Sequence, residues 1–472
     1  MKALTRSTFV TFLTAARREL SGFPWQIATL IYAISWGGSL LLPNTLYWDD
    51  WQYISNQPER SLNSIFLETG LPPWRAVFDQ ELILLGYATI PALTFLMYFG
   101  SGLFLFLILK RTNVFENSSI TLLILVFITS SVNHARIAKV MFGYTTSYFL
   151  FFAAWALLAN SRSMRSRLIA FLLFFISFMT HSFLIFLILP LIHTVFFQNS
   201  RGVIQKIKEA MPSILALFTI AITYTYLRSI YWQPQNQFIN YQKIYANGVF
   251  KSLFLLVPFV CCLLITYVRF RSSRQVSKEL KMLIIGTFAL AVSLFPYLIS
   301  NNINRYIFSF NIGWQSRHLM LTPLGISFVV VGISQLISKK KHYIAKLALT
   351  LSVLVNIFVG SQYYLQSVQQ AEISNLFKTQ NIPGVVAEFG DETARFKGRG
   401  ATYSEYEFFG MLNESGYSYP KRVGYKYVCK ANPAGIKLTV KSDKSFFNAL
   451  LSRDTGTYFE ITTCAEVLLQ QG

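Results

Sequence analysis

The sequence contains few charged residues, with Asp, Glu, Lys and Arg making up 13% of its 472 residues. A soluble globular chain carries about 25% of these residues, so the scarcity excludes an ordinary soluble enzyme and a disordered scaffold. Cysteine is also rare: four residues exclude a secreted module that depends on many disulfides. The four cysteines and five histidines are scattered without ligand spacing, so the sequence indicates no metal site.

The sequence also lacks the short motifs of nucleotide and hydrolase chemistry. It contains no P-loop, no GxGxxG fingerprint at a strand–helix junction and no nucleophile elbow of the serine hydrolases. We therefore do not expect an ATP-driven pump.

Long apolar runs are what the sequence has in abundance. Hydrophobic residues make up 53% of the chain and its mean hydropathy is +0.42. A helix needs about 20 apolar residues to cross a bilayer, and the runs approach that length. After a first run at 25–42, others lie near 82–109, 119–133, 141–160, 168–197, 213–228, 250–268, 282–299, 319–338 and 343–363. The sequence therefore predicts an α-helical polytopic membrane protein.

The net charge of +21 falls mainly in short basic clusters between these runs, which is the positive-inside pattern and indicates contact with lipid headgroups rather than nucleic acid. The run 168–197 has basic clusters at both ends, and as one helix it would be about 45 Å long, too long for one crossing. A hairpin that bends near Thr180–Ser182 satisfies both observations. We thus predict about 11 transmembrane helices, and with the N-terminus in the cytoplasm this odd number leaves the C-terminal region outside.

Three regions follow along the chain. Residues 1–22 are predicted to form a cytoplasmic amphipathic N-terminus, and residues 23–363 the transmembrane domain, with an outside loop at 44–81. Residues 364–472 have turn signals and alternating apolar runs at 436–440 and 458–462, which predict a small extracytoplasmic α/β domain. Cys429 and Cys464 both fall in it; they either form a disulfide, which would fit an oxidising compartment, or remain free thiols.

The outside loop begins with a pair of acids, Asp49 and Asp50, between Trp48 and Trp51. A carboxylate near the membrane is costly, so acids at this depth are candidates for function. Tryptophan is common at the interface and can also stack on sugar rings. The alternative is an interfacial turn with solvated acids and an ordinary aromatic belt. Asp79 and Glu81, at the end of the same loop, are further candidates, or simply cap an interfacial helix.

Cations in other outside loops depart from the positive-inside rule, which predicts few of them there. A bound anion explains them most simply, and a lipid-linked phosphate has the appropriate charge and depth. The alternative is pairing with headgroups or with the acids of the first loop. These basic residues are Arg136, Lys139, Arg305, Arg317 and His318.

This layout resembles that of the GT-C glycosyltransferases, and within them the bacterial and phage-type O-antigen glucosyltransferases of the Gtr family. The resemblance rests on Trp48-Asp49-Asp50-Trp51 after the first span and on the segment from Arg399 to Glu407 near the C-terminus. It implies a GT-C-like fold in the bacterial inner membrane, with the C-terminal domain in the periplasm. It also implies an enzyme that moves a hexose, glucose above all, from an undecaprenyl-phosphate-linked donor to O-antigen or a related surface glycan, with inversion.

The resemblance also suggests roles for the candidate residues. Asp49 or Asp50 would be the general base, and the basic residues of the outside loops would hold the donor phosphate. The sugar and the acceptor would contact Trp48, Trp51, Asp79, Glu81, Tyr144, Tyr306 and Trp314. No cofactor is expected, although an aspartate pair can also bind a divalent metal ion.

Two other classes of protein remain open. A glycan polymerase of the Wzy kind is also polytopic and rich in outside arginine, but usually carries its large loop in mid-chain. A polytopic lipid or glycan transporter would have internal repeats and ionisable groups within its spans, and neither is evident in the sequence.

Overall fold

The computed structural model describes a chain that divides into two compact units. The described residues are 19–37, 39, 45–48, 50–51, 66, 68–84, 86, 89–160, 163–196, 203–235, 244, 246–273, 277–299, 314–338, 342–389, 405–416 and 428–471. The first unit comprises Met1–Ser35, Ser61–Arg136 and Met141–Asn356, and the second comprises Trp36–Arg60, Ile137–Val140 and Ile357–Gly472. Almost all of the predicted N-terminal segment 1–22 lies outside the described residues.

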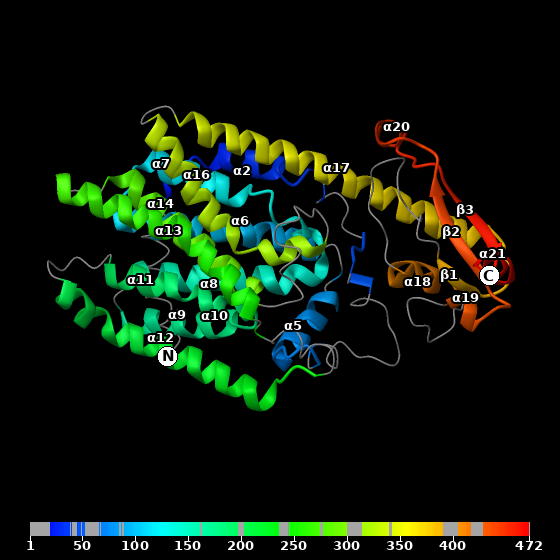
Figure 1. The fold of residues 1–472 in the computed structure, drawn as a ribbon, viewed down its shortest axis with the longest axis horizontal. Coiled ribbons are helices and arrows are strands. Elements are labelled where there is room, and N and C mark those ends of the chain that lie inside the picture. The colour runs from blue at the N-terminus through cyan, green and yellow to red at the C-terminus, as the bar shows by residue number, and fades with distance from the viewer. Residues whose placement is uncertain are drawn as a thin grey trace. The chain divides into compact units, whose positions relative to one another are not determined.

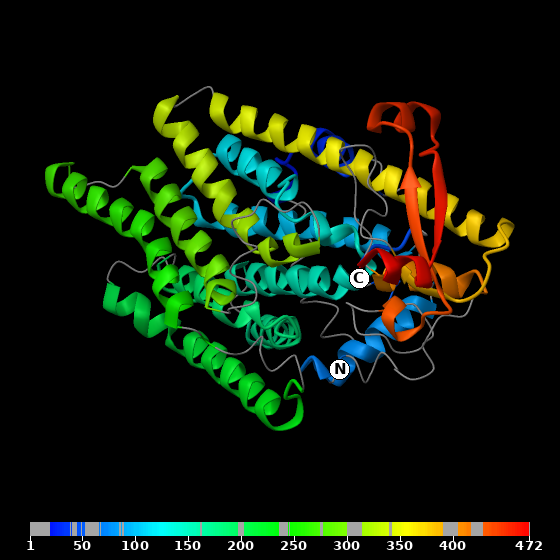
Figure 2. The same ribbon diagram turned by 45° about the vertical axis from the view of Figure 1, so that its right-hand side comes forward.

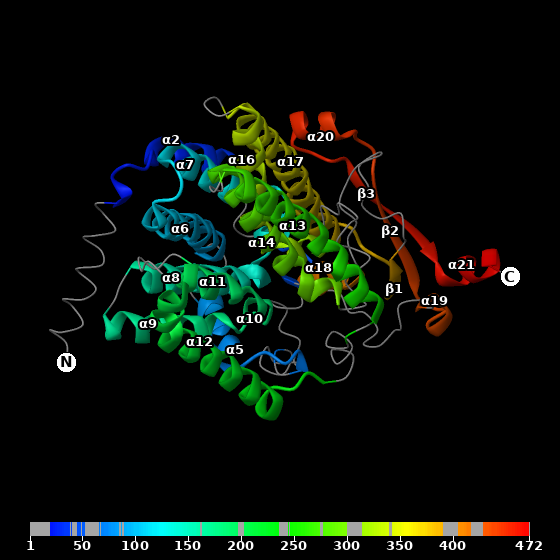
Figure 3. The same cartoon turned by 60° about the vertical axis from the view of Figure 1, so that its left-hand side comes forward.

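The first unit is built from helices. Its long ones are α6 (Thr89–Thr112), α8 (Phe142–Asn160), α12 (Val203–Tyr231), α13 (Ala246–Ser273), α14 (Lys278–Leu298) and the beginning of α17 (Tyr343–Thr379). Its shorter ones are α2 (Trp25–Ile34), α5 (Pro73–Leu84), α7 (Asn117–Ile128), α9 (Met164–Ser177), α10 (Ser182–Phe186), α11 (Ile188–Phe196) and α16 (Thr322–Ile337). Helices α6 and α8 lie side by side, and so do α14 and α16 (Figure 3).

The helices confirm the prediction of a polytopic membrane protein. In the described part of the chain, six are long and apolar enough to cross a membrane, and four shorter apolar helices accompany them. Large apolar side chains are exposed along α12 and α13, as expected for surfaces that face lipid. Among them are Ile204, Leu215, Phe218, Ile222, Phe250, Leu253, Phe254, Leu264 and Tyr267.

The long apolar run 168–197 is interrupted where the sequence predicts. Helix α9 ends at Ser177 and α10 begins at Ser182, with His181 in the turn between them. Helix α17 continues without a break to Thr379, so it extends from the last predicted apolar run, 343–363, into the C-terminal region.

Small residues allow α14 and α16 to approach each other closely. A Cβ atom on Gly325 would lie 2.6 Å from the backbone nitrogen of Leu290, and one on Gly286 would lie 2.8 Å from the backbone nitrogen of Val329. Without water to drive apolar association, helices in a membrane depend on such close packing.

The second unit contains the predicted α/β domain. Its strands are β1 (Val386–Phe389), β2 (Ile436–Ser442) and β3 (Thr457–Thr463), with β1 parallel and β3 antiparallel to the central β2. Strands β2 and β3 confirm the strands expected from the alternating runs. The described helices around the sheet are α18 (Glu405–Glu414), α19 (Val428–Ala431), α20 (Phe446–Ser452) and α21 (Cys464–Gln471) (Figures 1 and 2).

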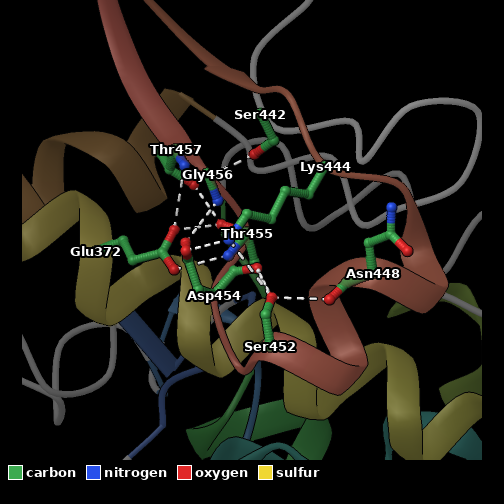
Figure 4. Close-up of polar contacts among 9 residues, drawn as sticks. All are labelled: Glu372, Ser442, Lys444, Asn448, Ser452, Asp454, Thr455, Gly456 and Thr457. Atoms are coloured by element: carbon green, nitrogen blue, oxygen red, sulfur yellow. Dashed lines mark hydrogen bonds and ion pairs between the residues drawn. The ribbon is translucent and has the colours of Figure 1, made fainter.

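A disulfide links two helices of this domain, and polar contacts hold the domain to α17. Cys429 and Cys464 form a disulfide between α19 and the start of α21, which confirms the first of the two alternatives. Glu372 of α17 accepts hydrogen bonds from the backbone N–H groups of Thr455 (2.8 Å) and Thr457 (3.3 Å), and from the Thr455 hydroxyl (Figure 4). The turn before β3 is thereby fixed to α17.

Candidate functional site

Asp50, the described member of the acidic pair, is buried in the second unit. Its Oδ2 accepts hydrogen bonds from the backbone N–H groups of Tyr47 (3.1 Å) and Lys139 (3.0 Å), and its Oδ1 from that of Val140 (2.8 Å). The side chain is 0% exposed. The acid of the first predicted outside loop and the basic segment after the third predicted span therefore meet in one place.

Burial dominates the electrostatics of this carboxyl. It raises the pKa of Asp50 from 3.8 to about 6, although the three backbone N–H groups and the Lys139 cation act in the opposite direction. Removing a carboxylate from water disfavours its charged form, while donors and cations favour it. The pKa of Asp50 is therefore higher than that of an ordinary carboxyl, as is common for carboxyls at functional sites.

The Lys139 side chain is held close by. It is 1% exposed, and its Nζ donates to the backbone carbonyl of Thr45 at 2.9 Å. The Thr45 hydroxyl forms a hydrogen bond of 2.7 Å with that of Ser367, and Gln370 Nε2 donates to the Leu46 carbonyl at 2.6 Å. Polar side chains of α17 thus fix the segment that carries Asp50.

The two tryptophans beside the acidic pair have different surroundings. Trp48 is half-buried, adopts a positive φ of 50°, and donates its backbone N–H to Glu407 Oε1 at 2.9 Å. A positive φ is costly for a bulky residue and persists only where neighbouring contacts enforce it. Trp51 is 5% exposed and packs in the core of the second unit with residues such as Ile373 and Phe377. That packing gives Trp51 a structural role, and its predicted sugar contact stays a prediction.

A buried ion pair dominates the first unit near the start of α5. Arg75 Nε lies 2.5 Å from Asp79 Oδ2, and the two side chains are 1% and 0% exposed. The guanidinium carbon lies 5.7 Å from the ring centre of Phe66 and 5.6 Å from that of Tyr144. A Cβ atom on Gly143 would lie 1.5 Å from this carbon, so only glycine leaves room for the guanidinium. Asp79 therefore has a cation beside it, and Tyr144 is part of the same cluster.

Two basic residues of the later outside loops, Arg317 and His318, lie near Tyr297. The Tyr297 ring centre lies 5.2 Å from that of His318, and Arg317 and Tyr144 are near enough to interact electrostatically with its hydroxyl. Burial, reinforced by the Arg317 cation, lowers the pKa of His318 well below its usual value, so the imidazole is neutral at pH 7. His318 would therefore serve an anion as a hydrogen-bond donor and not as a charge.

Arg136 lies on a segment joined to the one that carries Arg317. The backbone N–H of Ala135 donates to Ser316 Oγ at 2.8 Å. Arg136 is 5% exposed, and its guanidinium lies 5.3 Å from the ring centre of Tyr98. Two basic segments far apart in the sequence are therefore neighbours within the first unit.

Some predicted site residues cannot be placed. Asp49, Arg305 and Tyr306 lie outside the described residues, and of Trp314 only the backbone is described, in the 3-10 helix Trp314–Leu319. Glu81 is exposed on α5. Among the described residues, no group of three or more His, Cys, Asp or Glu side chains could hold a metal ion.

Sequence reasoning missed Arg75 and Tyr297. Arg75 and Asp79 stand four residues apart, a spacing that brings two side chains together on one helical face, so the ion pair could have been predicted from the sequence. Tyr297 lies within an apolar run, and no sequence signal distinguishes it from the many other aromatic residues there.

Fold and composition together define the class: a multi-pass α-helical membrane protein with a small α/β domain at its C-terminal end. A comparison with known protein families finds no match, and neither does one with curated proteins. Among solved structures, the chain is similar to ArnT from Cupriavidus metallidurans bound to undecaprenyl phosphate, at 11% identity and a TM-score of 0.39, covering 92% of this chain and 97% of that one. It is also similar to ArnT from the same organism in the apo state, at 12% identity and a TM-score of 0.40, covering 93% and 98%.

Proposed function

We propose that this protein is a membrane glycosyltransferase of the GT-C type. It moves a hexose, most simply glucose, from an undecaprenyl-phosphate-linked donor to O-antigen or a related surface glycan at the periplasmic face of the inner membrane. The observation that carries the proposal is the buried contact of Asp50 with the backbone of Lys139 and Val140. It joins the segment that carries the acidic pair to the basic segment that also carries Arg136, and sugar transfer from a phosphate requires both a base and cations.

We assign different roles to the two aspartates. A general base must be reached by the acceptor hydroxyl, whereas the Asp50 side chain is 0% exposed and its two oxygens already accept three backbone hydrogen bonds. Asp50 therefore positions the loop, and Asp49 is the base. The acceptor oxygen attacks the anomeric carbon from the face opposite the phosphate, the carbon–oxygen bond to phosphate breaks, and the acceptor proton passes to the Asp49 carboxylate. Undecaprenyl phosphate leaves with the bonding electrons, and the anomeric configuration inverts.

The basic residues of the outside loops stabilise the negative charge on the departing phosphate. Arg136 and Arg317 are the best candidates, since their segments are joined by the Ala135–Ser316 hydrogen bond. Arginine suits this task because its planar fork of donors matches two phosphate oxygens. The Nζ of Lys139 already donates to a backbone carbonyl, so this cation supports the Asp50 site and contributes less to phosphate binding.

The disulfide supports a periplasmic C-terminal domain. Disulfides persist in oxidising compartments such as the periplasm and are rare in the cytosol. Together with the odd number of spans predicted from the sequence, Cys429–Cys464 favours an N-terminus in the cytoplasm and a C-terminus outside.

The test is transfer of radiolabelled glucose from undecaprenyl-phosphate-linked glucose to a lipid-linked glycan by purified protein in detergent. Asp49→Asn is expected to reduce transfer by 100-fold or more, within the range for loss of a general base. Asp50→Asn is expected to reduce it less, because the loop is displaced but the base remains. The exposed Asp443 provides the matched control Asp443→Asn, which is expected to transfer like the wild type.

Normal transfer by the Asp49→Asn and Asp50→Asn variants would contradict the assignment of the site. Absence of transfer from glucose, galactose and mannose donors, with joining of lipid-linked repeats instead, would indicate a glycan polymerase. Movement of label across sealed vesicles without transfer would indicate a transporter.

A further inference from the structure

A second group of aromatic and polar side chains lies in the first unit, apart from the residues discussed above. It consists of Trp74 on α5, Phe175 on α9, His181 in the turn before α10, Tyr224 and Arg228 on α12, and Trp232 just after α12. We refer to these six residues as the aromatic cluster. The Trp74 and Trp232 rings meet edge to face at 4.7 Å, and the ring centres of Tyr224 and Trp232 are 5.9 Å apart. The ring centre of Tyr224 lies 6.0 Å from that of His181 and 5.5 Å from that of Phe175.

Backbone contacts fix the two segments that carry the tryptophans. The N–H of Gln235 donates to the carbonyl of Glu68 at 2.8 Å. Gly70 has a φ of +77°, and a Cβ atom there would lie 3.0 Å from Pro234 and from the carbonyl of Trp232. The loop before α5 and the loop after α12 are therefore locked together, and the position of Trp74 beside Trp232 is built into the fold.

The aromatic cluster contains buried polar atoms that lack hydrogen-bond partners among the described residues. They are Trp74 Nε1, His181 Nε2, Tyr224 Oη and Arg228 Nε. Tyr224 is 0% exposed. A buried donor or acceptor without a partner costs about 1–3 kcal/mol, so native proteins rarely contain several in one place. Four such atoms around one set of rings make the aromatic cluster a candidate binding site.

The chemistry of these atoms defines what binds. Trp74 Nε1 and Arg228 Nε can only donate, so the bound molecule must offer acceptor oxygens. Arg228 is the one residue of the aromatic cluster with a permanent positive charge. A single positive charge among neutral donors does not balance the two negative charges of a phosphate dianion. The same set of donors is compatible with a ligand that offers uncharged hydroxyl groups. The aromatic rings offer apolar faces, as carbohydrate rings require.

We propose that the aromatic cluster is a saccharide-binding site that holds a hexose ring of the acceptor glycan. Its role as an acceptor site rests on the proposed function, whereas the binding of a saccharide does not. Trp232 and Trp74 cover the ring, and the hydroxyl oxygens accept from Trp74, Arg228 and Tyr224.

The experiment is saturation-transfer NMR with the full-length protein in lipid nanodiscs free of sugar detergents. The probes are methyl α-glucopyranoside, methyl α-galactopyranoside and methyl α-mannopyranoside. Trp232→Leu is expected to weaken binding at least tenfold. Tyr224→Phe removes a single oxygen atom and is expected to weaken binding about three- to tenfold, the loss of one hydrogen bond. Trp25→Leu, which alters a half-buried tryptophan on α2, is the matched control and is expected to bind like the wild type.

Three outcomes would overturn the proposal. The first is that the wild type shows no saturation transfer to any of the three glycosides, and the second is binding that neither Trp232→Leu nor Tyr224→Phe weakens. The third is that inorganic phosphate displaces the glycosides and that this displacement depends on Arg228. The first outcome would leave water as the partner of the four atoms. Asp49→Asn, which is expected to stop transfer, is expected to bind the glycosides normally. Failure of the saccharide site is thus distinguishable from failure of the glycosyltransferase assignment.

Discussion

The buried ion pair of Arg75 and Asp79 allows a sharp test of whether Asp79 stabilises the fold or contacts a sugar. Asp79→Asn removes the negative charge from beside a guanidinium that is 1% exposed. Breaking a buried pair in this way typically costs 3–5 kcal/mol, because one charge remains in a medium of low polarity. Replacing both partners by apolar residues is often neutral, because no charge remains to be desolvated. We therefore expect Arg75→Met with Asp79→Leu to be more stable than Asp79→Asn alone.

The size of the effect follows from the chain length. Unfolding entropies near 2.1 cal/mol/K per residue give about 1 kcal/mol/K for 472 residues unfolding together. Asp79→Asn should then lower the melting temperature by about 3–5 °C. Gly143→Ala should have an effect of the same order, since its Cβ would lie 1.5 Å from the guanidinium carbon and would displace it.

Thermal unfolding of the purified protein in detergent, followed by tryptophan fluorescence, measures these shifts, and the transfer assay run in parallel measures function. Glu116→Gln, at an exposed ion pair, is the control and is expected to shift the melting temperature by less than about 1 °C. The reasoning is refuted if the double variant is no more stable than Asp79→Asn alone. A double variant that is stable but inactive would instead assign Asp79 to substrate binding.

Three further predictions concern the second unit. The pKa of Asp50 is raised to about 6, so the folded state favours the protonated form of this carboxyl. The stability of the wild type relative to Asp50→Asn should therefore be highest below about pH 4 and fall by about 3 kcal/mol as the pH rises through 6. A difference in melting temperature between the two proteins that stays constant from pH 4 to 7.5 would contradict this. Reduction of the Cys429–Cys464 disulfide should destabilise the C-terminal domain by about 4 kcal/mol, with no effect of reductant on Cys429→Ser as the check. Glu372→Gln should weaken the contact with Thr455 by about 1–3 kcal/mol and speed protease cleavage before β3, while cleavage unchanged from the wild type would count against the contact.

The sequence alone determined the architecture, because the bilayer imposes a length and a polarity on every helix that crosses it. Apolar runs, basic clusters and the break near His181 each reflect this constraint, and the structure has helices and a turn in those places. The alternating runs in the C-terminal region likewise determined β2 and β3, because a strand with one buried face repeats every two residues. The two cysteines of this region allowed a disulfide, but spacing along the chain could not show that their Cα atoms lie 4.9 Å apart.

Only the tertiary structure decided what each candidate residue contacts. Asp50 and Lys139 are separated by many residues and are joined through backbone N–H groups, which every residue carries and which leave no mark in a sequence. Trp48 and Trp51 read alike as interfacial aromatics, yet one is half-buried and the other packs in a core. The aromatic cluster combines side chains of three helices and of two connecting segments, and unmatched hydrogen-bonding atoms become visible only when their surroundings are known. The local pattern of apolar and polar residues determines the helices, the strands and their order along the chain. Which charged groups and which hydrogen-bond donors and acceptors pair with one another depends on packing between segments far apart in the sequence.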